Sequence, residues 1–163
     1  MTGTAIIDNK KLIDGVAVKA LKRNKDERGY FEELIRKTDD FFKEGFGQLS
    51  HSFMYPGIIK AWHIHKTQID WWFCLKGDLK VALCDVRESS TTKNIINEFQ
   101  IGEHSENIII KIPAGIAHGC KVISASAELL YITSGVYSQE EEGRIAHDDP
   151  KIGYNWFKTP DIK

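Results

Sequence analysis

Short apolar runs rich in Val, Ile, Phe, Tyr and Trp recur along the chain between clusters of Gly, Asp, Asn and Pro. They follow one another at roughly the 8 to 12 residue spacing that is typical of β-sandwiches and β-barrels. The predicted strands are residues 15–21, 29–36, 47–55, 58–65, 69–76, 79–86, 107–112, 117–123 and 127–133. This pattern predicts an all-β fold.

One segment, 38–44, has the composition of a helix start, with a threonine or aspartate that could cap it and acidic residues in its first turn. One or two short helices leave the all-β class unchanged. The segment around Gly77 separates two apolar runs, so we expect a tight hairpin that pairs 69–76 with 79–86 antiparallel. The aromatic residues of the last stretch, 148–163, predict a tail that packs against the rest of the chain.

The length of 163 residues suits one domain, 1–163, with a single core. The chain has 22 basic and 23 acidic residues and a net charge of -1, which favours a small ligand over nucleic acid or an anionic membrane. Three cysteines, Cys74, Cys84 and Cys120, lie in apolar runs without paired spacing, and we expect buried free thiols. No membrane span or signal peptide is recognised, which predicts a cytoplasmic protein.

Three histidines and a carboxylate are the candidate chemistry. His63 and His65 point to the same face of a strand, because strand side chains alternate. Asp70 opens the next strand and His118 follows a Pro-x-Gly turn, so both could meet this pair inside a barrel. A lone strand histidine is more often an ordinary core or surface residue, and we expect that of His51, His104 and His147. A buried set of three is different, because each imidazole needs a partner.

The spacing of these residues resembles both signatures of the cupin superfamily, with aspartate in place of the usual glutamate. The matching residues are Gly57, His63, His65, Asp70 and Gly77 in the first signature, and Pro113, Gly115 and His118 in the second. Asn107 and Val122 stand where the second signature has Gly and Asn. The resemblance implies a cupin fold, a double-stranded β-helix or jelly-roll barrel.

Within the cupins, residues 15–157 resemble the dTDP-4-dehydrorhamnose 3,5-epimerase family through several ordered motifs. The matching segments are 26–33 (D-x-R-G-x-F-x-E), 48–52 (Q-x-N-x-S), 60–63 (R-G-L-H), 112–119 (I-P-x-G-x-A-H-G), 130–133 (L-Y-K-T), 136–137 (Y-Y), 142–145 and 148–150. The family implies an isomerase without a cofactor. It epimerises a nucleotide-linked 4-keto-6-deoxy sugar at C3, C5 or both, in deoxysugar synthesis for surface polysaccharides such as the O-antigen.

The resemblance also implies a role for each matched residue. His63 would be the base that removes the proton next to the C4 ketone, and Tyr131 the acid that reprotonates the opposite face. The predicted substrate-binding residues are Tyr137 and His118 around the sugar, Arg28, Glu33, Gln48 and Glu142 at the nucleotide end, and Lys60 at the family's arginine position. The family further implies a homodimer, in which the segment with Arg28 reaches the neighbouring subunit's site.

The sequence departs from the family at the predicted site. Lys60 replaces an arginine, His65 a glutamine and Asp70 a lysine, and the family's late Lys-Asp, a candidate partner for the base, has no counterpart. Loss of the cation at 70 predicts a weaker stabilisation of the enolate unless another donor or a metal takes over. Lys60 is also out of phase with His63 on a regular strand, so we expect a bulge between them.

Two alternatives remain open at this point. In the first, the chain is a metal-dependent cupin enzyme, an isomerase or dioxygenase, in which His63, His65, Asp70 and His118 bind Fe, Mn, Ni or Zn. In the second, it binds a sugar nucleotide without turnover. The main interpretation needs no metal or other cofactor.

Overall fold

The computed structural model describes residues 11–158, which form an almost entirely β structure. The strands are β1 (Ala17–Ala20), β2 (Asn24–Asp26), β3 (Gly29–Phe31), β4 (Gln48–Met54), β5 (Ile59–His65), β6 (Asp70–Lys76), β7 (Asp78–Asp85), β8 (Ile96–Gly102), β9 (Ile108–Ile112), β10 (Ile116–Val122), β11 (Ala127–Thr133) and β12 (Glu142–Arg144). The helical content of these residues is one 3-10 turn, η1 (Asp40–Phe42). Within the same range, nothing helical is long or apolar enough to traverse a bilayer.

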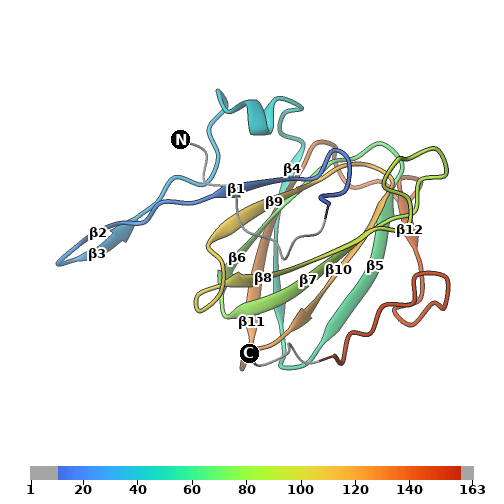
Figure 1. The fold of residues 1–163 in the computed structure, drawn as a ribbon. Coiled ribbons are helices and arrows are strands. Elements are labelled where there is room, and N and C mark those ends of the chain that lie inside the picture. The colour runs from blue at the N-terminus through green and yellow to red at the C-terminus, as the bar shows by residue number, and fades with distance from the viewer. Residues whose placement is uncertain (1–10, 159–163) are drawn as a thin grey trace.

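The strands build two five-stranded sheets that face each other as the walls of a barrel (Figure 1). One wall has the order β1-β9-β6-β11-β4, and the other has the order β12-β5-β10-β7-β8. We call them wall A and wall B. Neighbouring strands within each wall pair antiparallel. The predicted all-β, jelly-roll class is therefore confirmed.

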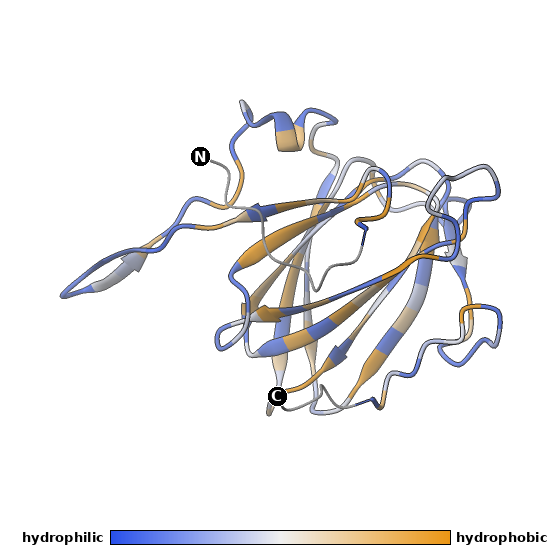
Figure 2. Cartoon of the chain, viewed as in Figure 1, coloured by the Kyte–Doolittle hydropathy of each residue, from blue (hydrophilic) through white to orange (hydrophobic). Residues whose placement is uncertain are grey.

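The main core fills the space between the two walls. It consists mostly of aliphatic side chains from both sheets, among them Leu79, Val81, Leu83, Ile101 and Ile110, each fully buried. Figure 2 shows apolar stretches along the strands of both walls and polar loops between them. The expected free thiols are also confirmed, since all three cysteines are buried and unpaired.

A second apolar cluster seals the outer face of wall B. Trp62 points away from the barrel interior, opposite to its histidine neighbour, and packs against Trp156 with ring centroids 4.9 Å apart. Tyr154 completes this cluster. The prediction that the C-terminal stretch packs down holds for Trp156, which is 1% exposed, whereas Phe157 is 68% exposed.

The predicted hairpin at Gly77 is wrong. β6 pairs with β9 and β11 in wall A, whereas β7 pairs with β8 and β10 in wall B, so the chain crosses between walls at this point. A single residue separates the two strands, and the shortest common hairpin loop has two. Gly77 takes the left-handed φ of +70°, and a Cβ there would lie 2.0 Å from the Ser126 carbonyl oxygen. The corner therefore requires glycine.

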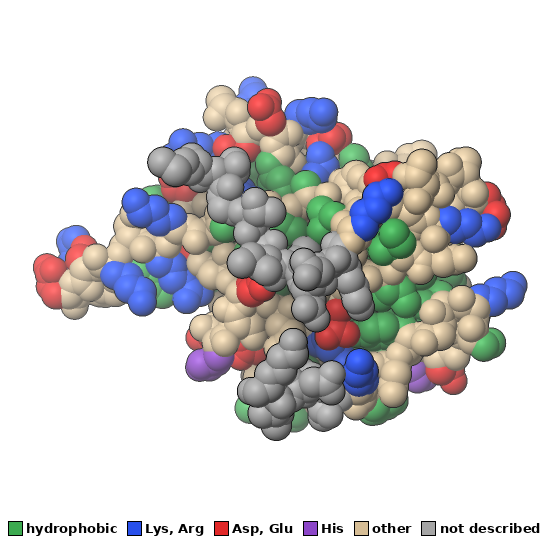
Figure 3. Space-filling view, in the orientation of Figure 1, with side chains coloured by type: hydrophobic (Ala, Val, Ile, Leu, Met, Phe, Trp, Pro, Cys, Tyr) green, Lys and Arg blue, Asp and Glu red, His purple; other side chains and the backbone are tan. Residues whose placement is uncertain are grey.

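The segment predicted as strand 29–36 also differs. Only β3 is extended, and it pairs with β2, which was not predicted, in an arm that projects from the barrel (Figures 1 and 3). The predicted helix start shrinks to η1, because the side chain of Asp39 makes no capping bond. It accepts a hydrogen bond from Lys19 Nζ at 2.6 Å instead. Strands β8 and β12 are further elements that the apolar pattern did not predict.

Candidate active site

One cavity of about 290 Å³ lies between the two walls. Its lining includes most of the residues predicted as site residues. They are Gln48, Lys60, His63, His65, Asp70, His118, Tyr131, Tyr137 and Glu142. The sequence motifs, which are scattered over more than half of the chain, therefore meet around a single hollow.

Wall B supplies the imidazoles. His63 and His65 both line the cavity, as the alternation along β5 predicted. His118 lies directly opposite His63 in the pairing of β10 with β5, and their ring centroids are 6.2 Å apart. The short strand β12 continues this wall, with Glu142 opposite His65 and Arg144 opposite His63.

Wall A supplies the carboxylate and the phenol. Asp70 and Trp72 are two residues apart on β6, so both face inward. Their partners across β11 are Thr133 and Tyr131, respectively. The cavity therefore has the predicted base, His63, on one wall and the predicted acid, Tyr131, on the other.

The His63 ring is held by a carboxylate. Its Nδ1 lies 3.1 Å from Glu142 Oε1. An ionised carboxylate can only accept hydrogen bonds, so Nδ1 carries the proton and donates the hydrogen bond to Glu142. Nε2 is then left with its lone pair. Burial lowers the pKa of His63 and outweighs the opposite effect of Glu142, which keeps the ring neutral at pH 7. The arrangement leaves a free, uncharged base.

Glu142 is itself oriented by a neighbour. Arg144 Nη2 lies 3.3 Å from the same Oε1 atom that accepts from His63. Arg144 also lines the cavity and remains exposed. It was not singled out from the sequence, although its position two residues after Glu142 on a strand would have placed it on the same face.

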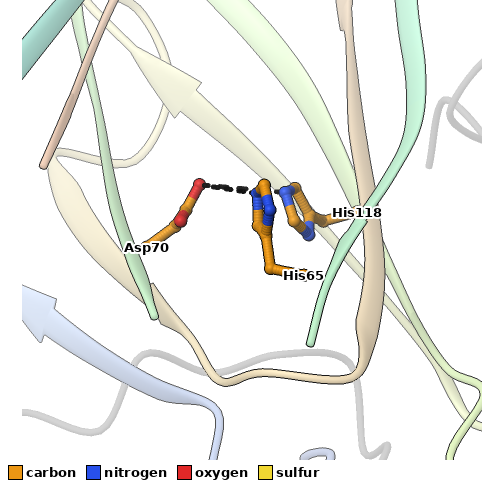
Figure 4. Close-up of side chains that lie close together, drawn as sticks. All are labelled: His65, Asp70 and His118. Atoms are coloured by element: carbon orange, nitrogen blue, oxygen red, sulfur yellow. Dashed lines mark ion pairs between the residues drawn. The ribbon is translucent and has the colours of Figure 1, made fainter. Parts of the chain in front are cut away.

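Two of the imidazoles lie close to the Asp70 carboxylate. Its Oδ2 atom lies 3.7 Å from His65 Nε2 and 3.8 Å from His118 Nε2, and these three atoms all lie within 4.8 Å of one another (Figure 4). Three of the four predicted metal ligands are thus brought together among the described residues. His63, the fourth, lies outside this group and bonds to Glu142.

His118 is the most enclosed of the three imidazoles. It is 2% exposed, and its ring stands at 88° against that of Trp72. The Nδ1 atom lies 2.9 Å from the carbonyl oxygen of Ile116, so Nδ1 carries the proton and Nε2 keeps its lone pair. Burial holds the pKa of His118 well below its usual range, although Asp70 opposes this shift. The ring is neutral and presents Nε2 toward Asp70.

The expected bulge before His63 is present. His118 pairs with His63, but Cys120 pairs with Lys60, so β5 has one extra residue between the two pairs. The bulge brings the Lys60 side chain to the cavity, where Nζ donates to Ser52 Oγ at 2.7 Å. The phase problem seen in the sequence is therefore resolved by the backbone of β5.

Arg28 and Glu33 are not part of the cavity formed by their own chain. Arg28 sits on the β2–β3 arm, its side chain 82% exposed, and it pairs with Asp26. Glu33 pairs with Arg36. The remaining histidines are surface residues, as expected. His51 pairs with Glu128, His104 with Asp78 and His147 with Asp148, and about half or more of each imidazole is exposed.

Two cavity residues beside the cluster were missed in the sequence. Gln68 Nε2 donates to Asp70 Oδ1 at 2.9 Å, and Trp72 Nε1 donates to Asp70 Oδ2 at 3.1 Å. Trp72 lies two residues after Asp70 on β6, so strand alternation places it on the same face. Gln68 precedes β6, so this periodicity does not place it. The Trp72 ring also packs in the core.

Comparison with known proteins agrees with this arrangement. A family model described as dTDP-4-dehydrorhamnose 3,5-epimerase matches residues 10–163. The chain belongs to this family. The dTDP-4-dehydrorhamnose 3,5-epimerase family consists of epimerases with a cupin-like fold, so the predicted fold and the predicted isomerase class are both confirmed.

Two curated relatives are close in sequence. The chain is 43% identical over 148 residues to "Spore coat polysaccharide biosynthesis protein SpsL" of Bacillus subtilis, covering 89% of this chain and 97% of that protein. It is 38% identical to "Probable low-salt glycan biosynthesis epimerase Agl13" of Haloferax volcanii, covering 88% and 94%. These near-complete alignments extend the family assignment over the whole barrel.

A solved structure shows the same fold. The enzyme dTDP-6-deoxy-D-glucose-3,5-epimerase RmlC from Legionella pneumophila, in complex with dTDP-4-keto-L-rhamnose, superposes with a TM-score of 0.82 at 25% identity. The match covers 94% of this chain and 84% of that one. The fold of this epimerase therefore extends over nearly all of the chain.

Proposed function

We propose that the protein is a nucleotide-sugar epimerase that inverts C3, C5 or both in a 4-keto-6-deoxyhexose linked to a nucleoside diphosphate. The single observation that supports this most is the placement of His63 and Tyr131 on opposite walls of one cavity. An inversion needs a base on one face of the sugar ring and an acid on the other. A pair of groups on facing walls meets that requirement.

The reaction follows from the two groups. The Nε2 lone pair of His63 takes the proton from the carbon next to the ketone, and the electron pair of that C–H bond moves into the ketone to give an enolate. The Tyr131 hydroxyl then gives its proton to the opposite face of the same carbon, and the ketone re-forms. Atoms and charge balance without an oxidant or an organic cofactor.

Glu142 acts on this step through His63. By accepting from Nδ1–H, it fixes the tautomer in which Nε2 is the base, and it stabilises the imidazolium that forms after proton abstraction. The sequence resemblance assigned Glu142 to the nucleotide end. We instead propose a positioning role for Glu142 beside the base.

The cavity is large enough for only one part of a nucleotide sugar. A volume of about 290 Å³ lies at the small end of the roughly 300 to 1,000 Å³ that is usual for ligand pockets, and it suits a single hexose. The nucleoside diphosphate would then lie at the opening, where Lys60, Arg144 and Tyr137 are exposed. Two cations at this opening would favour a diphosphate.

We also propose a homodimer. The β2–β3 arm projects from the barrel and exposes Tyr30 and Phe31, which is unfavourable for an isolated chain. Strand β4 is an edge of wall A and exposes Leu49 and Phe53. Contact between arm and partner would cover these side chains and carry Arg28 toward the partner's cavity.

For the cellular role, we propose deoxysugar synthesis for a surface glycan, since both curated relatives are named for polysaccharide or glycan biosynthesis. Surface polysaccharide of the O-antigen type is one such product. Three thiols that are free and buried fit a reducing compartment, so we place the protein in the cytoplasm.

The experiment is solvent exchange. The protein is incubated in deuterated water with 4-keto-6-deoxyhexoses linked to several nucleoside diphosphates, and NMR follows deuterium at C3 and C5 together with the appearance of the epimer. Exchange with inversion supports the proposal. Tight binding of every form without exchange, unchanged in His63→Ala, would identify a sugar-nucleotide binder and refute it.

A further inference from the structure

Asp70 is a buried carboxylate without a cationic side chain to neutralise it. It is 3% exposed, and within residues 11–158 its ion pairs involve no lysine or arginine. Its oxygens accept from the neutral donors of Gln68 and Trp72, which orient the group but carry no charge. A charge held in this position requires a compensating positive charge, because burying it alone is costly.

The groups nearest to Asp70 are suited to hold a metal ion. His118 presents the lone pair of Nε2 toward Oδ2, because its Nδ1–H is committed to the Ile116 carbonyl. A lone pair that faces a carboxylate across 3.8 Å is unfavourable, and a positive charge between the two groups would turn this repulsion into attraction. His65 Nε2 lies 3.7 Å from the same oxygen. Figure 4 shows both rings directed at Asp70.

We propose that His65, Asp70 and His118 bind a divalent transition-metal ion. Two imidazoles and one carboxylate are the donor set that Zn²⁺, Fe²⁺, Mn²⁺ and Ni²⁺ share. Two ligands that are each about 2.1 Å from a tetrahedral ion lie about 3.4 Å apart. The two distances to Asp70 Oδ2, 3.7 and 3.8 Å, exceed this by a few tenths of an ångström, and all three ligand atoms lie within 4.8 Å of one another, so side-chain rotations would close the set around an ion.

The surroundings resemble those of a supported ligand set. Gln68 and Trp72 each fix one oxygen of Asp70, and the Ile116 carbonyl fixes the tautomer of His118. Such outer hydrogen bonds orient metal ligands and raise their basicity. His63 lies outside the group and keeps its own carboxylate, so metal binding and proton abstraction would use separate residues.

The role of the ion rests on the proposed function. The family has lysine where this chain has Asp70, so the positive charge expected near the enolate oxygen is missing. A bound divalent ion would supply it as a Lewis acid that polarises the ketone. Lys60 also lines the cavity, but its Nζ donates to Ser52, and the ion pairs of Asp70 within residues 11–158 do not include it.

The test measures metal without substrate. The full chain is expressed in metal-supplemented medium, stripped with a chelator and reloaded with Zn²⁺ or Co²⁺, and bound metal is determined by elemental analysis and by the ligand-field absorption of Co²⁺. We expect about one ion per chain. Asp70→Asn and His118→Gln should each lower occupancy at least tenfold at the same free-metal concentration.

The control is His104→Gln, which removes another histidine that bonds to an aspartate but lies on the surface. It should leave occupancy unchanged. Less than about a tenth of an ion per folded wild-type chain, or full occupancy in Asp70→Asn, would overturn the metal site. If either variant fails to fold, the Co²⁺ spectrum and the metal-dependent rise in melting temperature of the wild type decide instead. Exchange by the metal-stripped protein would refute only the role of the ion as a Lewis acid, and metal binding without exchange would refute only the epimerase.

Discussion

His63 Nδ1 lies 3.1 Å from Glu142 Oε1, across the pairing of β5 with β12. The sequence had lost the family's late Lys-Asp, which left the base without a visible partner. In the structure, a carboxylate from the neighbouring strand takes that place. The contact depends on only three residues of strand, since β12 spans Glu142–Arg144.

This contact can be tested by Glu142→Gln. The carboxylate raises the pKa of His63 against the effect of burial, so its removal should lower that pKa further. The acidic limb of kcat/KM should therefore move to lower pH. We also expect kcat to fall about 10- to 100-fold, because the tautomer is no longer fixed. The measurement is a pH profile of epimerisation.

Glu128→Gln is the matched control for that variant. Glu128 bonds to His51 at the same 3.1 Å, but on the outer surface. Its removal should alter neither kcat nor the position of the acidic limb. A profile of Glu142→Gln that coincides with the wild type would contradict the positioning role.

The division of labour between the walls predicts different defects for base and acid. His63→Gln should lose both deuterium exchange and inversion, each by about 10²- to 10⁴-fold. Tyr131→Phe should lose inversion but retain exchange, because His63 can still remove a proton and return a deuteron to the same face. NMR of the substrate in deuterated water separates the two. Equal loss of both signals in Tyr131→Phe would argue against a role as the acid.

The projecting arm predicts that sites are shared between subunits. Arg28→Ala and His63→Ala should each be inactive alone, but a refolded equal mixture should regain about one quarter of wild-type activity, because one site in each mixed dimer is intact. Light scattering should give twice the mass of 18.5 kDa. A monomer, or a mixture without recovery, would exclude an Arg28 that acts in the partner's site.

The corner between the two walls predicts that a glycine-to-alanine change destabilises the protein more at Gly77 than at Gly57. Gly77→Ala adds a Cβ at 2.0 Å from the Ser126 carbonyl oxygen as well as an unfavourable φ of +70°, and should cost at least about 3 kcal/mol of unfolding free energy. Gly57→Ala shares the positive φ, +72°, but meets no atom within 4 Å. It should cost about 1 kcal/mol. Urea denaturation at fixed protein concentration measures both, and equal losses would refute the steric argument.

The C-terminal segment offers a second comparison of neighbours. Trp156→Ala should destabilise by about 3 kcal/mol, because it removes a side chain that is 1% exposed and packs on Trp62. Phe157→Ala should cost about 0.5 kcal/mol, since that ring is 68% exposed and its contact is with the Lys121 ammonium on the surface. Similar melting temperatures for the two variants would mean that this segment contributes little to the barrel.

The sequence predicted the barrel well wherever strand periodicity carried the information. Alternation on β5 placed His63 and His65 in the cavity and Trp62 outside, as observed. β8 escaped prediction because Asn97 interrupts its apolar alternation. Asn97 is fully buried, and its side chain accepts a hydrogen bond from the Ile13 backbone N–H at 2.9 Å. A polar residue therefore occupies an inward-facing position that would normally be apolar.

Long-range pairing was harder to predict than strand identity. The apolar runs on either side of Gly77 looked like a hairpin, because sequence cannot distinguish a turn within a sheet from a corner between sheets. The partner of His63 was missed for a similar reason. Glu142 lies 79 residues away along the chain, and only the pairing of β12 with β5 brings it there.

The one-residue corner at Gly77 has a consequence for protein engineering. β6 carries Asp70 on one wall, and the chain continues directly into β7, which pairs along its length with the strand that carries His118. No spare chain separates the two, so an insertion at this corner would shift the register of both walls at once.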